Sequence, residues 1–228
     1  MCGRIANTLP SDSMARLFAA LPSNSLPSVP NFNICPTNDI HVVRASGDTG
    51  GASRALVAMR WGFIPHWYKT PNDGPLLINA RAETIAEKPA FRAAVRSHRC
   101  LIPASGYYEW TKDAEGKRLP WYFTRADRES VVMAGIWQTW SSGEGDDAQD
   151  TCAVVTCAAN AATADVHHRM PVILAPRDWG KWLGEEGKGA AILMQPAPDE
   201  ALNVHRVRAE VNSNRASGAQ LIEPFETS

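Results

Sequence analysis

The chain has 228 residues, of which 44% are hydrophobic. A chain of this size buries about 70% of its unfolded surface, which excludes global disorder. Lysine and arginine number 23, aspartate and glutamate 24, and the net charge of −1 excludes a polybasic protein that holds nucleic acid by bulk charge. A local basic groove is compatible with this balance.

Runs rich in Val, Ile and aromatic residues predict strands at residues 40–45, 55–61, 76–80, 99–103, 121–125, 130–137 and 151–157. Apolar spacing of three and four residues predicts helices at 11–21, 89–97, 177–183 and 213–221. The polar stretches 47–53 and 141–150 are expected to be surface loops. Strands and helices mix without βαβ alternation, so we expect one α+β domain over residues 1–228, with a mainly antiparallel sheet.

Composition also bears on cellular location and on metals. The chain has no apolar stretch of about 18 residues, and its first residues carry Arg4, Asp12 and Arg16 where a signal peptide would be apolar. We therefore expect a cytoplasmic protein that does not enter membranes. The five cysteines have no paired spacing, which argues against a disulfide framework, and without a CxxC or HExxH pattern we expect no metal and no cofactor.

Cysteine at position 2 is the first candidate for chemistry. A small residue there permits removal of Met1, which would leave Cys2 with a free α-amine beside its thiol. The reference pKa of an α-amine is about 7.7–8.0, against about 10.4 for lysine, so a sizeable fraction is neutral near neutral pH. Such an amine forms an imine with an aldehyde, and the thiol can then close on the imine carbon to give a five-membered thiazolidine.

Seven segments carry a family resemblance, and they occur in order along the chain: Met1-Cys-Gly-Arg4, Asn31-Phe-Asn-Ile-Cys-Pro36, Arg60-Trp-Gly-Phe63, Ile78-Asn-Ala-Arg-Ala-Glu-Thr84, Arg99-Cys-Leu-Ile-Pro103, Gly106-Tyr-Tyr-Glu-Trp110 and Val166-His-His-Arg-Met-Pro171. Together they closely resemble the SRAP family, the SOS-response-associated peptidase-like proteins. Any one segment is a weak signal, whereas seven in order are strong.

The resemblance implies a fold and a function. The implied fold is a compact α+β domain with a bifurcated, barrel-like β-sheet flanked by helices. The implied activity is recognition of abasic sites in single-stranded DNA, followed by covalent crosslinking of Cys2 to the ring-opened sugar as a thiazolidine that shields the lesion. This is lyase-type imine chemistry in a DNA-damage response. The family name records an older proposal of thiol autoproteolysis, in which Cys2 removes Met1. We expect a monomer, associated with the nucleoid when bound to DNA.

The resemblance also implies roles for individual residues. Cys2 is the expected nucleophile, Asn79 its hydrogen-bonding neighbour, Glu109 the general acid/base, and His167 the residue that assists sugar opening. The expected DNA-binding residues are Arg4, Asn33, Trp67, Arg81, Trp110 and Arg169. Arginines suit phosphates, and tryptophan rings can stack on unpaired bases. If Glu109 is buried among its aromatic neighbours, desolvation should raise its pKa.

Two departures from the family pattern affect the histidine segment. The family often has Asp after its His, and His168 stands there; it often has a second Arg before the Pro, and Met170 stands there. Neighbours in an extended segment point to opposite sides, so we expect only one of the two imidazoles to face the site. Register against the family motif selects His167.

Three alternatives stay open at this level. N-terminal-nucleophile amidotransferases also begin Met-Cys-Gly, but this chain has no Asn-Gly dipeptide of the kind that their substrate loops use. A non-covalent single-stranded DNA or RNA binding module would explain the aromatic and arginine residues, but it assigns no joint role to Cys2, Glu109 and His167. The third alternative is a protease that acts only on its own Met1, and the sequence does not distinguish it from a crosslinking protein.

Overall fold

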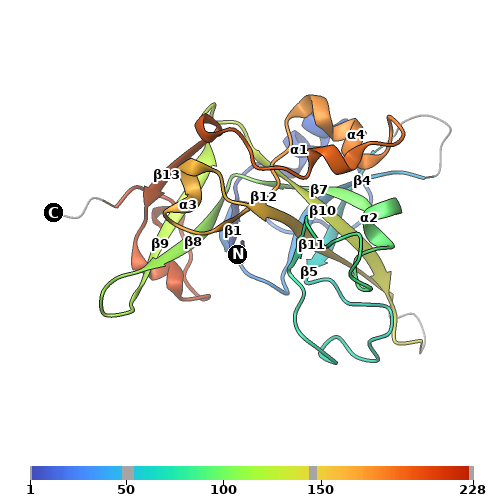
Figure 1. Ribbon diagram of the computed structural model, residues 1–228, viewed down its shortest axis with the longest axis horizontal. Coiled ribbons are helices and arrows are strands. Elements are labelled where there is room, and N and C mark those ends of the chain that lie inside the picture. The colour runs from blue at the N-terminus through green and yellow to red at the C-terminus, as the bar shows by residue number, and fades with distance from the viewer. Residues whose placement is uncertain (1, 48–53, 144–147, 226–228) are drawn as a thin grey trace.

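A closed ring of five strands forms one half of the molecule (Figure 1). The computed structural model describes residues 2–47, 54–143 and 148–225. In order around the ring the strands are β11 (Gln149–Ala158), β10 (Val131–Trp140), β7 (Arg99–Ala104), β4 (Asp39–Ala45) and β5 (Arg54–Trp61). Neighbours pair antiparallel except β5 and β11, whose parallel pairing closes the ring.

Three short strands extend the ring. β2 (Ala20–Pro22) pairs with β5, while β6 (Asn79–Arg81) and β12 (Arg169–Pro171) both pair with β11. The two partners of β11 meet its C-terminal half, where Thr156 lies opposite Arg81 on one side and Pro171 on the other. This half of β11 therefore brings together segments that lie about ninety residues apart in the chain.

A second, open sheet lies beside the ring, on the left in Figure 1. Its antiparallel strands run in the order β13 (Leu202–Arg206), β9 (Arg118–Arg125), β8 (Gly106–Lys112), β1 (Ile5–Asn7) and β3 (Asn31–Ile34). One face carries Tyr107 and Phe123 into the core shared with the ring. The other face carries Tyr108 and Tyr122 into a smaller cluster with the C-terminal segment, including Leu221.

Short helices complete the fold. α1 (Ser11–Phe18) and α4 (Trp179–Leu183) lie above the ring in Figure 1, α2 (Ala94–Ser97) lies at its side, and α3 (Ala161–Ala164) lies next to the open sheet. The predicted α+β fold with a mainly antiparallel, barrel-like and bifurcated sheet is confirmed. Within the described part of the chain, no helix is long and apolar enough to cross a membrane.

The predicted strands follow the structure closely where they are long, and β4, β5, β7, β9, β10 and β11 lie over six of the seven predicted runs. The seventh, 76–80, is displaced, because Leu77 forms only an isolated bridge with Phe63 and the strand begins at Asn79. The predicted loops 47–53 and 141–150 lie partly outside the described residues.

The predicted helices are shorter than expected. The helix from Ser11 ends at Phe18 because Ala19 is left-handed, with φ 48°, and its N–H closes on the preceding turn. Between 89 and 97 only the last turn is α-helical, since Phe91 bonds to Lys88 with the tighter three-residue spacing. The prediction of a helix at 213–221 is wrong: one 3₁₀ turn, Ala209–Asn212, ends before this segment, Gly218 with φ 107° interrupts it, and a second 3₁₀ turn, Ala219–Leu221, forms its end.

Candidate active site at the junction of the two sheets

Cys2 lies where the open sheet meets the ring. It precedes β1, which pairs with β8 so that Ile5 lies opposite Tyr107, and the Tyr108 amide donates to the Arg4 carbonyl at 2.9 Å. Continued by two residues, this register brings the start of the chain alongside Glu109. Cys2 is 1% exposed. On the ring side, Asn79 Nδ2 of β6 donates to the Cys2 carbonyl oxygen at 2.8 Å.

Burial sets the electrostatics of this junction. Glu109 is 3% exposed, and desolvation raises the pKa of its carboxyl to about 7, against the charge of the chain's amino group, which lowers it. The expected burial and pKa shift of Glu109 are therefore confirmed. Desolvation also raises the pKa of the Cys2 thiol well above its ordinary value, and the Glu109 carboxylate raises it further. The thiol is thus protonated at neutral pH, beside a carboxyl that titrates there.

Asn79 has an unused acceptor at the same place. Its Oδ1 is buried and has no hydrogen-bond partner among the described residues, while its Nδ2 holds the Cys2 carbonyl. A buried polar atom without a partner costs about 1–3 kcal/mol, so such atoms in a native protein call for an explanation. A ligand donor next to Cys2 would satisfy it.

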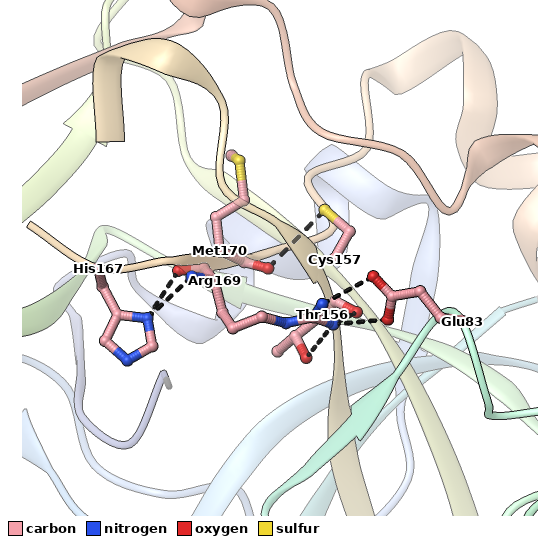
Figure 2. A network of polar contacts seen from close by, with 6 residues as sticks. All are labelled: Glu83, Thr156, Cys157, His167, Arg169 and Met170. Carbon is pink, nitrogen blue, oxygen red and sulfur yellow. Dashed lines mark hydrogen bonds and ion pairs between the residues drawn. The ribbon is translucent and has the colours of Figure 1, made fainter. Parts of the chain in front are cut away.

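The His167 ring is held by the backbone of Arg169 (Figure 2). Its Nδ1 lies 2.9 Å from the Arg169 amide nitrogen and 3.2 Å from the Arg169 carbonyl oxygen, so it accepts from the amide in one tautomer and donates to the carbonyl in the other. Partial burial lowers the pKa of His167, and the charge of the chain's amino group lowers it further. Both effects favour the neutral form of the ring.

The expectation that His167 and His168 point to opposite sides is wrong. Their rings stack, with centroids 4.4 Å apart and an interplanar angle of 24°. The reason is local: β12 begins only at Arg169, so the two histidines lie in the turn that follows α3 and not in extended backbone. They still differ in environment, because His167 is half-buried and His168 is exposed.

Arg169 is engaged by a carboxylate (Figure 2). Its guanidinium donates to both carboxylate oxygens of Glu83, at 2.7 and 2.8 Å, and to the Thr156 carbonyl at 2.7 Å. The Arg169 side chain is 11% exposed and that of Glu83 51%. A phosphate that binds Arg169 must therefore compete with Glu83, and the predicted phosphate contact stays a prediction.

Arg4, Asn33 and Trp110 form a connected group next to the site. Arg4 is buried, and its Nη1 donates to Asn33 Oδ1 at 2.5 Å and to the Val211 carbonyl at 2.8 Å. Both Arg4 and Arg118 contact the Trp110 ring, with their Cζ atoms 5.7 and 4.4 Å from its centroid. These contacts bind the residues to the protein itself, and their predicted contacts with DNA stay predictions.

Arg81 and Trp67 are accessible. They line a groove of about 370 Å³ together with Asn79 and Phe91. Trp67 is 49% exposed, and Arg81 is exposed at the end of β6. The groove thus reaches Asn79, whose side chain bonds to the Cys2 carbonyl, so an aromatic ring and a guanidinium line the same groove as Asn79.

The structure also brings in residues that sequence reasoning did not select. Glu83 lies two residues after Arg81 in one of the quoted segments, and the alternation of opposite charges there was the available signal. Thr156 had no such signal, because its role depends on the β11–β12 pairing. Across residues 2–47, 54–143 and 148–225, no three His, Cys, Asp or Glu side chains cluster as a metal site.

Comparison with known proteins agrees with this geometry. The family model described as SOS response associated peptidase (SRAP) matches residues 1–214. The chain belongs to the SRAP family. YoqW of Bacillus subtilis strain 168, named an abasic site processing protein, is 33% identical over 197 residues, covering 85% of this chain and 86% of YoqW. YedK of Escherichia coli K12, with the same description, is 30% identical over 232 residues, covering 98% of this chain and all of YedK.

Solved structures share the architecture of this SRAP chain. A protein from Bacteroides thetaiotaomicron superposes with a TM-score of 0.85 over 99% of this chain and all of that one, at 22% identity. A protein from Bordetella bronchiseptica superposes with a TM-score of 0.75 over 91% of this chain and all of that one, at 27% identity. The ring and the open sheet therefore form a fold common to these proteins.

Proposed function

We propose that this chain recognises abasic sites in single-stranded DNA and forms a covalent thiazolidine with the ring-opened sugar through Cys2, after removal of Met1. Met1 itself lies outside the described residues. The observation that carries the proposal is the setting of Cys2: its carbonyl is held by Asn79, and Glu109, with a pKa of about 7, lies beside it. The relatives' names, abasic site processing proteins, support the choice of substrate.

The first stage is imine formation. The Cys2 α-amine adds to the C1′ aldehyde and gives a carbinolamine, whose hydroxyl must leave as water. Protonated Glu109 supplies the proton, and the products are a protonated imine (iminium), one water and a Glu109 carboxylate. A carboxyl with a pKa near the working pH suits this role, because both its forms are populated.

The second stage closes the ring. The Cys2 sulfur adds to the iminium carbon, the thiol proton passes to the Glu109 carboxylate, and the C=N electron pair returns to nitrogen, which becomes the neutral N–H of the thiazolidine. Aldehyde and aminothiol thus give thiazolidine and one water, with no change of oxidation state. Burial favours the thiol over the thiolate in the free protein, so a neighbouring base is needed at this stage.

The remaining residues act on the sugar and the backbone. The neutral imidazole of His167 is suited to assist opening of the sugar, and the unused Asn79 Oδ1 is suited to accept from a sugar hydroxyl or from the α-amine. Arg81 and Arg169 are assigned to the flanking phosphates, and Trp67 to an unpaired base.

The test is a denaturing gel with abasic and intact oligonucleotides. Wild-type protein should give a heat-stable adduct with the abasic oligonucleotide and none with the intact oligonucleotide. Cys2→Ala should lose that adduct because it has no thiol, yet its α-amine should still form an imine that borohydride traps. Intact mass establishes first that Met1 is absent from both proteins.

Each other outcome has a definite meaning. An equally stable untrapped adduct in Cys2→Ala contradicts the thiazolidine assignment. Binding without any adduct, trapped or untrapped, favours the non-covalent binding module. Glutamine hydrolysis that depends on Cys2, without an adduct, favours the amidotransferase alternative.

A further inference from the structure

A row of three side chains crosses the open sheet from the proposed site. Glu109 on β8 lies opposite Trp121 on β9, and Trp121 lies opposite Arg206 on β13. Directly opposed residues of antiparallel strands point to the same face of a sheet. The three side chains therefore share one face, and with neighbouring strands about 4.8 Å apart, β13 lies roughly 10 Å from β8.

This face is the one that carries the chemistry. Tyr107 and Phe123, which alternate in phase with Glu109 and Trp121, belong to the core shared with the ring. The opposite face of the sheet is covered by the C-terminal segment. Arg206 thus lies on the same side of the sheet as Glu109, at the far end of the row.

Trp121 fixes the direction of Arg206. The indole Nε1 donates to Thr111 Oγ1 at 2.9 Å, which holds the ring in place. The Arg206 Cζ lies over this ring, 5.2 Å from its centroid. The guanidinium therefore lies over the Trp121 ring of β9, on the face of the sheet that carries Glu109, and the ring face that it covers is not available for a base.

Arg206 has no carboxylate partner in the described part of the chain. Other partly buried arginines do: Arg54 pairs with Glu185, Arg125 with Asp127 and Arg169 with Glu83. The Arg206 Nε is buried and lacks a hydrogen-bond acceptor among the described residues. A half-buried guanidinium that no carboxylate neutralises is suited to an anionic ligand with several acceptor oxygens, such as a phosphate.

We propose that Arg206, oriented by Trp121, binds a backbone phosphate of the DNA strand one or two nucleotides from the sugar held at Cys2. This rests on the proposed function and extends it, because it gives the strand a path over the open sheet. Arg206 is a binding residue in this assignment, and Trp121 is a positioning residue that acts through it.

The experiment measures non-covalent binding, so that crosslinking does not interfere. Three oligonucleotides carry a tetrahydrofuran abasic analogue, which has no aldehyde. The two-sided one has several nucleotides on both sides of the analogue, and the two one-sided ones have nucleotides only on its 5′ side or only on its 3′ side. Affinity is measured by fluorescence anisotropy over a salt series. Arg206→Gln removes the charge and keeps most of the stem over Trp121; its melting temperature is compared with wild type.

Arg206→Gln should weaken binding roughly tenfold for the two-sided oligonucleotide and for one of the one-sided oligonucleotides. The slope of log K against log salt should become shallower by about 0.7, the value for one phosphate on a single strand. The other one-sided oligonucleotide should bind Arg206→Gln with the same affinity as it binds the wild-type protein. Arg206→Lys should restore the slope, and Trp121→Leu should weaken binding of the same oligonucleotides as Arg206→Gln.

Arg208→Ala is the matched control, because Arg208 is exposed two residues further on and lies over Phe225, outside the row. It should leave the preference among the three oligonucleotides unchanged. Equal losses in Arg208→Ala and Arg206→Gln, or an equal loss on all three oligonucleotides, would overturn the inference. Unchanged binding by Arg206→Gln, with wild-type crosslinking intact, overturns it alone; absence of wild-type crosslinking overturns the proposed function instead.

Discussion

The closed ring and the open sheet differ in how they satisfy their buried polar groups. On the five ring strands, Arg44 Nε is the one buried side-chain nitrogen or oxygen without a hydrogen-bond partner in the described residues. The open sheet has Tyr107 Oη, Tyr122 Oη and Arg206 Nε in that condition. A ring has no free edge, so the backbone groups of its strands can be paired internally. Asn79 Oδ1 on β6 and Arg169 Nε on β12 are also without a partner among the described residues, so these groups lie mainly on the open sheet and on the short strands added to the ring. Buried polar atoms without a partner call for an explanation, and Asn79 lies at the candidate site.

The site needs both regions. Glu109 belongs to the open sheet, but its pKa of about 7 arises because the shared core excludes water from it. Asn79 belongs to a strand attached to the ring, and it holds the chain start that the open sheet supplies. The candidate site therefore takes residues from both sheets, Glu109 from the open sheet and Asn79 from a strand attached to the ring.

The largest expected effect is on the free energy of unfolding, which a variant in the ring should lower far more than a variant in the open sheet. Trp61→Ala, in the ring, removes a side chain that is 0% exposed and whose Nε1 donates to the Ile78 carbonyl. It should lower the free energy of unfolding by about 3–5 kcal/mol. Tyr107→Phe, in the open sheet, removes a hydroxyl without a partner and should change it by less than about 1 kcal/mol. Urea unfolding measures both, and similar losses would contradict the comparison.

The next effect is a pH dependence of stability at Glu109. Its folded pKa of about 7 is above the ordinary 4.5, so the native state binds the extra proton and stability falls as pH rises from 4.5 through 7. Glu109→Gln should therefore unfold like wild type at pH 5 but be more stable by up to about 3 kcal/mol at pH 8. The exposed Glu115→Gln is the control. Thermal melts at both pH values measure this, and a pH-independent difference would refute it.

The third effect distinguishes the stacked histidines. General acid/base assistance accounts for about 10²–10⁴-fold in rate. His167→Ala should slow crosslinking at least about tenfold with little change in binding to the tetrahydrofuran analogue, and His168→Ala should slow it less than about threefold. Single-turnover gels measure the rates. A slower His168→Ala would mean that the exposed ring of the stack, and not the half-buried one, serves the site.

The smallest effect concerns the ion pair between Arg169 and Glu83, on the ring side of the site. Glu83→Gln should release Arg169 for a phosphate and raise affinity for the tetrahydrofuran oligonucleotide by about two- to threefold, because a partly exposed ion pair contributes less than about 1 kcal/mol. Glu87→Gln, exposed in the same segment, removes an equal charge as the control. Weaker binding by Glu83→Gln alone would show that Glu83 positions Arg169 and does not compete with the DNA.

Local pattern predicted the long elements well and the short ones poorly. The ring strands are six to ten residues long and rich in apolar side chains, so periodicity alone indicated them. β1, β3 and β12 have three or four residues, too few for a period, and exist because a neighbouring strand pairs with them. The helix expected at 213–221 does not form, because the Asn33 side-chain amide donates hydrogen bonds to the Ser213 and Ala216 carbonyls.

By itself, the sequence determined the family, the α+β class and the choice of candidate site residues, because seven ordered segments and a cysteine at position 2 are properties of the chain. Only the tertiary structure decided the surroundings of those residues. The pKa of Glu109, the stacking of His167 on His168, the ion pair of Arg169 with Glu83 and the alignment of Arg206 with Glu109 depend on burial and strand register. Burial and register arise from contacts between segments remote in sequence, which no local pattern encodes.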